Sequence, residues 1–115
     1  MASLGYIVIG IDHTFGSVAT VFSDDDISYL NLDALPPREE TPDFLDYANQ
    51  LVNTYASDVT TTLNYLEEIN DSAHPSRFSG KLDLTKIGLL GHSTGGGGDV
   101  AVAINDNRID AVLGL

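Results

Sequence analysis

The feature of this sequence that most constrains its fold is a glycine-rich turn between two segments of different character. Residues 91–95 read Gly-His-Ser-Thr-Gly, after the short apolar run 87–90 and before a small-residue segment, 99–104. The apolar run favours a strand and the small-residue segment favours a helix. A strand that passes straight into a helix is typical of a sheet whose parallel strands are joined by crossover helices.

Two further apolar runs and one long helix complete the expected alternation. Residues 6–11 are continuously apolar and rich in β-branched side chains, which is typical of a strand buried on both faces, and residues 111–115 predict a third strand. Thr41, Pro42 and Asp43 form a helix-start signal, and the helix should end near Asn70. Its apolar stripe consists of Leu51, Val52, Tyr55, Val59, Leu63, Leu66 and Ile69.

These elements predict an α/β fold of three parallel strands with crossover helices, in a single domain over residues 1–115. The polar stretch that contains residues 24–26, all aspartate, and Pro36-Pro37 predicts a long surface loop. The strand predicted at 111–115 should pair in parallel with the strand at 87–90. Packing must hold the long helix, because the threonine run at 60–62 weakens its intrinsic propensity.

Composition and charge exclude several classes of function. With 17 acidic and five basic residues the formal charge is −12, which repels nucleic acid and anionic membrane surfaces. A solvated surface is the ordinary interpretation of this acidity, and adaptation to high salt is the alternative. There is no cysteine, and His13, His74 and His92 lack metal-ligand spacing, so we expect no metal and no cofactor. No apolar run is long enough for a transmembrane segment, and the sequence fixes neither localisation nor oligomeric state.

The glycine-rich turn also carries the strongest chemical signal in the chain. The G-x-S-x-G pattern places Ser93 on a sharp strand-to-helix turn, where its hydroxyl projects above the sheet as a candidate nucleophile. We therefore expect a positive φ at Ser93. The N-terminus of the next helix would lie beside the reaction, so the backbone N–H of Thr94 is a candidate oxyanion donor.

Three other interpretations of the turn stay open. It could be a tight turn without chemistry, part of a non-catalytic binding or interaction domain, or a loop whose amides cradle phosphate or a nucleotide. The last lacks the Lys-Ser/Thr of a P-loop and the spacing of a dinucleotide-binding motif. Four consecutive glycines at 95–98 would cost a helix about 1 kcal/mol each, and close backbone approach is our hypothesis for them.

The segment Gly-Tyr-Ile-Val-Ile-Gly-Ile-Asp-His at 5–13, Leu-Asp at 82–83 and the run 87–96 together resemble the platelet-activating-factor acetylhydrolase-like branch of the α/β-hydrolases. Dienelactone hydrolases and polyesterases share this type of turn. The resemblance implies a serine carboxylic-ester hydrolase in which Ser93 attacks an ester carbonyl and Thr94 supplies one oxyanion amide. A small-molecule or lipid ester, such as a short acyl ester of a phospholipid, would be the substrate.

The resemblance also implies that residues 1–115 form only a partial α/β-hydrolase domain. The family has a strand before this segment, between the counterparts of 6–11 and 87–90. Either a gap of about 10 Å should therefore separate those two runs, which we favour, or the two strands should pair directly in a rearranged sheet. Its catalytic acid directly follows a strand of the 111–115 type, and its histidine comes later. We therefore expect an aspartate after Leu115, a histidine beyond it, and no enzymatic turnover by these residues alone.

The other acids and histidines are given structural interpretations. Asp99, Asp106 and Asp110 follow Ser93, but each is interpreted as a surface or capping acid, with Asp110 placed just before the last strand. His92 is interpreted as a packing residue and His74 as an exposed loop residue. His13 follows a predicted strand and should face the same rim of the sheet as Ser93, where it and His92 are possible pocket-lining residues.

Overall fold

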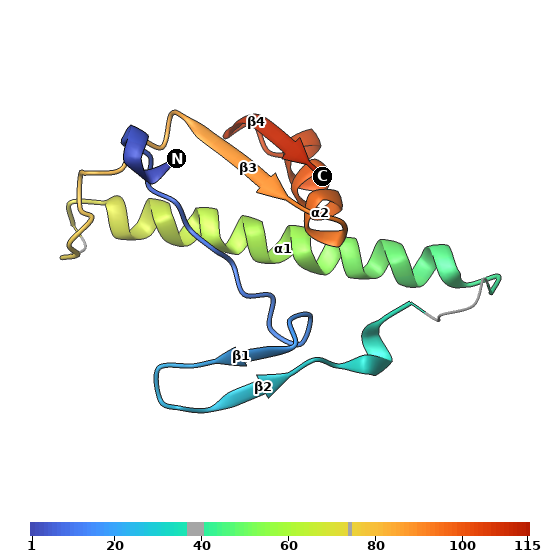
Figure 1. The fold of residues 1–115 in the computed structure, drawn as a ribbon. Helices are drawn as coiled ribbons and strands as arrows, with labels where there is room; N and C mark the ends of the chain where they lie inside the picture. Colours follow the sequence, from blue (N-terminus) through green and yellow to red (C-terminus); the bar gives the residue numbers. More distant parts are fainter. Residues whose placement is uncertain (37–40, 74) are drawn as a thin grey trace.

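A computed structural model describes residues 1–36, 41–73 and 75–115. It contains both helices and strands, with a parallel pair and an antiparallel pair of strands (Figure 1). In chain order the elements are η1 (Ala2–Leu4), β1 (Ala19–Val21), β2 (Ile27–Tyr29), η2 (Leu32–Ala34), α1 (Phe44–Asn70), β3 (Ile87–Gly91), α2 (Thr94–Asn105) and β4 (Ile109–Gly114).

The strands β3 and β4 form the parallel sheet, and α2 is the crossover between them. Leu89 pairs with Val112 and Leu90 with Leu113, which confirms the predicted parallel pairing. The register shifts between Ile87 and Gly88, opposite Asp110. There the Asp110 carboxylate accepts a hydrogen bond from the Ile87 amide at 2.9 Å, so a side chain supplies an acceptor at the irregularity. Asp110 therefore lies inside β4, and its predicted place before the strand is wrong.

The predicted strand at residues 6–11 is wrong. In the part of the chain that the structure describes, this run has no strand partner, and only two strands are parallel instead of three. Tyr6, Ile7, Val8 and Ile9 are exposed, whereas Ile11 packs against the core. An apolar β-branched run forms a strand only where a neighbouring strand accepts its backbone hydrogen bonds. Among the residues that the structure describes, β3 and β4 pair only with each other.

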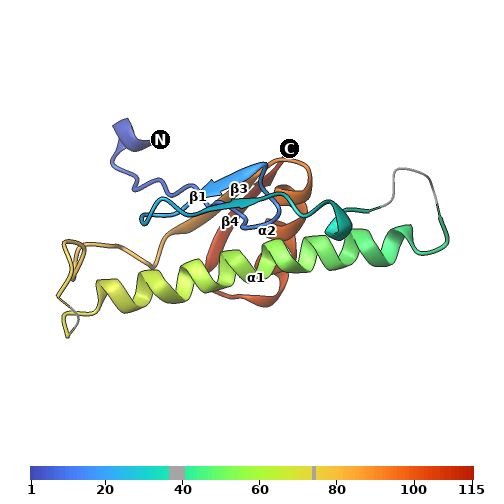
Figure 2. The same ribbon diagram turned by 90° about the horizontal axis from the view of Figure 1, so that it is seen from below.

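The predicted surface loop contains a small hairpin instead. In β1 and β2 Thr20 pairs with Ser28 in an antiparallel ladder, and residues 22–26, which include the three aspartates, connect the two strands. Asp25 adopts φ 67°, a left-handed value that aspartate tolerates better than most residues. The hairpin lies below α1 and the parallel sheet above it in Figure 1, whereas both lie on the same side of α1 in the turned view of Figure 2. Part of the predicted loop, residues 37–40, lies outside the described residues.

The helix α1 begins at Phe44 and ends at Asn70, so its predicted end is confirmed and its start is later than Thr41. It runs along the length of the molecule in both views (Figures 1 and 2). The hydroxyls of Thr60 and Thr62 donate to the carbonyls four residues earlier, at 3.0 and 2.9 Å. These bonds give the two hydroxyls partners within the helix. Without them the hydroxyls would compete with the helical hydrogen bonds for nearby backbone groups.

The core is small and lies between α1 and α2. Its buried apolar side chains are Val59 and Leu63 from α1 and Val102 from α2. The partly buried residues that pack against them are Ile11, Ala56, Ile87, Leu89 and Ile109. None of the helices in the described ranges combines the length and apolar character needed to cross a membrane.

Candidate active site

The turn at Ser93 has the geometry that the sequence predicts. Ser93 follows β3, directly precedes α2, and adopts φ 55° and ψ −121°, which confirms the expected positive φ. These values are those of the first central residue of a type II′ turn, a position that normally favours glycine. The amide of Gly95 donates to the carbonyl of His92 at 3.0 Å and closes the turn. A serine in this conformation is strained by about 1–3 kcal/mol, which the surrounding packing must offset.

Glycines allow the backbone segments around Ser93 to approach closely. A Cβ on Gly91 would lie 2.5 Å from the carbonyl carbon of Gly95 and 2.6 Å from the amide nitrogen of Gly96. A Cβ on Gly98 would lie 2.9 Å from the Cβ of Tyr55, on α1. A Cβ on Gly95, in contrast, would meet nothing within 4 Å. Close approach therefore explains Gly91, Gly96 and Gly98, but it does not explain Gly95.

The backbone around Ser93 is anchored to the end of β4. The Ser93 amide donates to the Leu115 carbonyl at 2.8 Å, and the Leu115 amide donates to the Gly91 carbonyl at 2.9 Å. Ser93 itself is exposed. The Thr94 amide, at the N-terminus of α2, has no hydrogen-bond acceptor among the described residues. An exposed hydroxyl thus lies next to a free helix N-terminal amide, which can stabilise a developing negative charge.

The two described histidines, His13 and His92, have different surroundings in the structure. His92 is exposed, so its interpretation as a packing residue is wrong. The Nδ1 of His13 lies 2.8 Å from Oδ2 of Asp58 on α1, and the His13 ring stacks on Tyr55 with centroids 3.7 Å apart. Neither of the two cavities described below is lined by a histidine. The predicted exposure of His74 concerns a residue outside the described part of the chain.

Asp99 differs most from its interpretation as a surface or capping acid. It is only 7% exposed, and no hydrogen bond reaches its carboxylate within the described ranges. Burial raises the pKa of this carboxyl, while the nearby charge of His13 opposes the shift. A Cβ on Gly91 would lie 2.5 Å from Oδ2 of Asp99, so the Asp99 carboxylate packs closely against Gly91, two residues before Ser93. Asp99 lies three residues before the buried Val102, so both side chains lie on the same face of α2. This spacing is the feature of the sequence that could have predicted the burial of Asp99.

Asp106 is a loop acid paired with Arg108, in keeping with its predicted structural role. The Arg108 side chain contacts both carboxylate oxygens, and the Arg108 amide donates to Oδ1 at 3.0 Å. These hydrogen bonds and the guanidinium charge lower the pKa of Asp106 to about 2. Arg108 also contacts Glu67 at 3.1 Å, and thereby ties the loop before β4 to α1.

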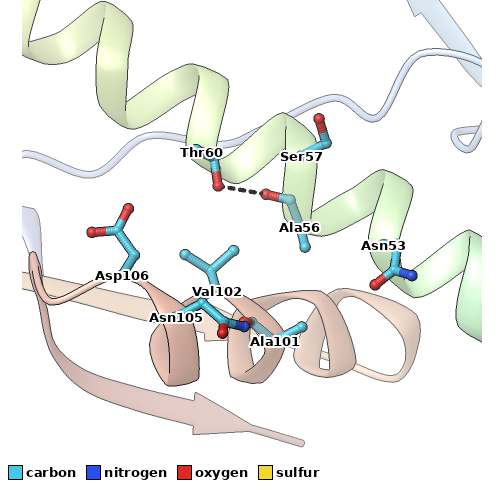
Figure 3. A pocket seen from close by; sticks show the side chains of 8 residues that line it. All are labelled: Asn53, Ala56, Ser57, Thr60, Ala101, Val102, Asn105 and Asp106. Atoms are coloured by element: carbon cyan, nitrogen blue, oxygen red, sulfur yellow. Dashed lines mark hydrogen bonds between the residues drawn. The ribbon is translucent and has the colours of Figure 1, made fainter.

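Two open cavities lie along α1. The first, of about 320 Å³, lies between α1 and α2, where side chains from both helices face it (Figure 3). Its lining residues are Asn53, Ala56, Ser57, Thr60, Ala101, Val102, Asn105 and Asp106. The second, of about 410 Å³, lies between the chain around the hairpin and the first half of α1. Ser93 and Thr94 line neither cavity, so the candidate nucleophile lies on an open surface.

A search of protein-family models, of curated proteins and of solved structures found no match to this chain. Within residues 1–36, 41–73 and 75–115, no group of three or more His, Cys, Asp or Glu side chains is arranged to hold a metal ion.

Proposed function

We propose that this chain carries the nucleophile of a serine carboxylic-ester hydrolase with an α/β-hydrolase fold. Ser93 is the nucleophile and the Thr94 amide is one donor of the oxyanion hole. The proposed substrates are small-molecule or lipid esters, including short acyl esters of phospholipids. The observation that carries the proposal is the conformation of Ser93, φ 55° and ψ −121°, on an exposed turn between a parallel strand and a helix.

This conformation supports the proposal because a strained residue needs a reason to persist. Glycine would adopt the same dihedral angles without the cost of a Cβ. A serine at this position lowers the stability of the fold, but it places an exposed hydroxyl beside a helix N-terminus. Acyl transfer by a serine nucleophile uses this arrangement. Gly91 and Gly96 support the same interpretation, because their lack of a Cβ lets β3 and α2 approach each other at the turn.

In the proposed reaction the Ser93 hydroxyl oxygen attacks the ester carbonyl, and a general base takes its proton. The tetrahedral oxyanion accepts a hydrogen bond from the Thr94 amide, and its collapse breaks the ester bond and releases the alcohol with the proton. Water then attacks the acyl-serine, releases the carboxylic acid and regenerates the hydroxyl. We propose that His13 is not this base, because the family that the sequence resembles places its histidine after the nucleophile in chain order, whereas His13 precedes Ser93.

Labelling with a fluorophosphonate, which reacts with activated serines, tests the proposal. Peptide mapping should find the label on Ser93 alone. Ser93→Ala should abolish labelling and lower kcat for p-nitrophenyl acetate by about 10⁶-fold, as nucleophile losses do. Ser57→Ala, which removes another exposed hydroxyl from α1, is the matched control and should change neither.

Two outcomes would contradict the proposal. One is label spread over several serines, which would indicate nonspecific reaction. The other is ester hydrolysis that survives Ser93→Ala, which would assign the activity to another group. Comparing acetate, butyrate and longer acyl esters in the same assay would then define the acyl preference.

A further inference from the structure

The larger of the two cavities along α1 has the size and the composition of a small-molecule site. Its volume of about 410 Å³ lies within the range of about 300–1,000 Å³ that is typical of ligand pockets. Its apolar lining residues come from the turn before the hairpin, from the chain after it and from α1. They are Phe15, Leu35, Tyr47, Leu51 and Tyr55. Three of these five side chains are aromatic, so the cavity offers a ligand more π surface than aliphatic surface.

Hydrogen bonds fix the turn that forms one side of this cavity. The Asn31 amide donates to the Phe15 carbonyl at 2.8 Å, and the Tyr55 hydroxyl donates to the Gly16 carbonyl at 3.2 Å. A Cβ on Gly16 would lie 2.7 Å from the Tyr55 hydroxyl oxygen, so only glycine allows this approach to α1. A cavity whose sides are already tied together loses little conformational freedom when a ligand binds.

Phe15 has two features that destabilise the fold. Its φ is 64°, a left-handed value that is an outlier for a bulky residue, and its side chain is 57% exposed. Strained residues concentrate at ligand sites, where the strain holds a side chain in the place that binding requires. A ligand in the cavity would also cover part of the exposed apolar surface of Phe15.

The charges around the cavity favour a cation. Asp33 lines it, and its amide donates to the side chain of Asn31 at 3.1 Å. Among the described residues that line the cavity there is no lysine, arginine or histidine. His13 stacks on Tyr55, but its Nδ1 lies 2.8 Å from the Asp58 carboxylate, which balances any positive charge on that ring. With a net charge of −12 over the whole chain, the field at this cavity attracts cations.

We propose that this cavity binds a small organic cation that carries a quaternary ammonium group. Such a group spreads its charge over methyl groups, which pack on aromatic rings and need no hydrogen-bond acceptor. A primary ammonium is strongly hydrated and would lose more on entering an aromatic site. The inference goes beyond ester hydrolysis and does not depend on it, because neither Ser93 nor Thr94 lines the cavity.

An amide ¹H–¹⁵N NMR titration with choline tests the proposal, and 3,3-dimethylbutan-1-ol is its neutral probe of the same shape. Choline should shift the signals of Phe15, Gly16 and Leu51 saturably, and the neutral alcohol should bind at least fivefold more weakly. A free cation and a phosphocholine headgroup share the quaternary ammonium group, so phosphocholine is the third probe. Its phosphate should be repelled by Asp33 and by the net charge, and choline should therefore bind more tightly.

Variants assign the binding to the aromatic and acidic side chains. Tyr47→Ala should weaken choline binding by about fivefold, whereas Tyr47→Phe, which keeps the ring, should leave it unchanged. Asp33→Asn should weaken it by about threefold. The matched controls are Tyr65→Ala and Glu68→Gln, which remove an exposed ring and an exposed acid of α1 outside the cavity lining.

Three results would overturn the inference. They are the absence of saturable choline shifts at the cavity, equal affinity for choline and its neutral analogue, and equal weakening by Tyr47→Ala and Tyr65→Ala. Tighter binding of phosphocholine than of choline would also contradict it, because the acid and the net charge would then play no part. The titration requires no catalysis, so its outcome is independent of whether Ser93 is labelled.

Discussion

The contact between Gly98 and α1 makes a quantitative prediction about the packing of the two helices. A Cβ at position 98 would lie 2.9 Å from the Cβ of Tyr55 and 3.2 Å from the amide nitrogen of Ala56. These atoms belong to the stem and backbone of α1, so they cannot move aside as the end of a flexible side chain does. Gly98→Ala must therefore push the two helices apart or distort one of them.

Gly95→Ala is the matched control, because Gly95 lies in the same helix and a Cβ there meets nothing within 4 Å. Both substitutions gain about 1 kcal/mol of helix propensity. Only Gly98→Ala adds the cost of overpacking, about 1–3 kcal/mol. The difference between the two variants isolates this steric cost, and Gly95→Ala should be the more stable by about 1–3 kcal/mol.

Urea unfolding followed by circular dichroism at 222 nm measures this difference. For 115 residues, with an unfolding entropy of about 2.1 cal/mol/K per residue, it corresponds to about 4–12 °C in Tm. Gly97→Ala should fall between the two variants, because its nearest contact is the Val52 Cγ2 at 3.2 Å, the end of a side chain. Equal stabilisation by Gly95→Ala and Gly98→Ala would refute the argument from close approach.

Three further predictions follow from single residues. Ser93→Gly should be more stable to urea than Ser93→Ala by about 1 kcal/mol, because only glycine relieves the positive φ; equal stabilities would show that the turn is unstrained. Thr20→Val should stabilise the protein by about 1 kcal/mol, because the buried Thr20 hydroxyl lacks a hydrogen-bond partner in the described chain, and a loss of stability would reveal a missed partner. The folded pKa of Asp106, about 2, lies below its ordinary value of 3.8, so its stabilising effect is present above pH 3.8 and is lost as pH falls through 2. Urea midpoints between pH 5 and 2 should show this loss in wild type and a smaller one in Arg108→Met, and identical curves would contradict it.

The sequence by itself determined the features that depend on residues adjacent in the chain. The apolar run at 87–90 and the glycines around Ser93 predicted the strand, the turn and the positive φ, because these depend on local steric limits. The apolar stripe of the long helix predicted its end at Asn70. The parallel pairing of β3 and β4 followed from the same local pattern, because two paired strands that are joined by a helical crossover run parallel to each other.

Only the tertiary structure decided which side chains are buried and which distant segments meet. Residues 6–11 have the composition of a buried strand, yet their backbone finds no strand partner in the described chain. The contact between His13 and Asp58 spans 45 residues, and the burial of Asp99 depends on how α2 packs between α1 and β3. Backbone pairing and desolvation are properties of the neighbours that folding brings together, and local sequence does not contain those neighbours.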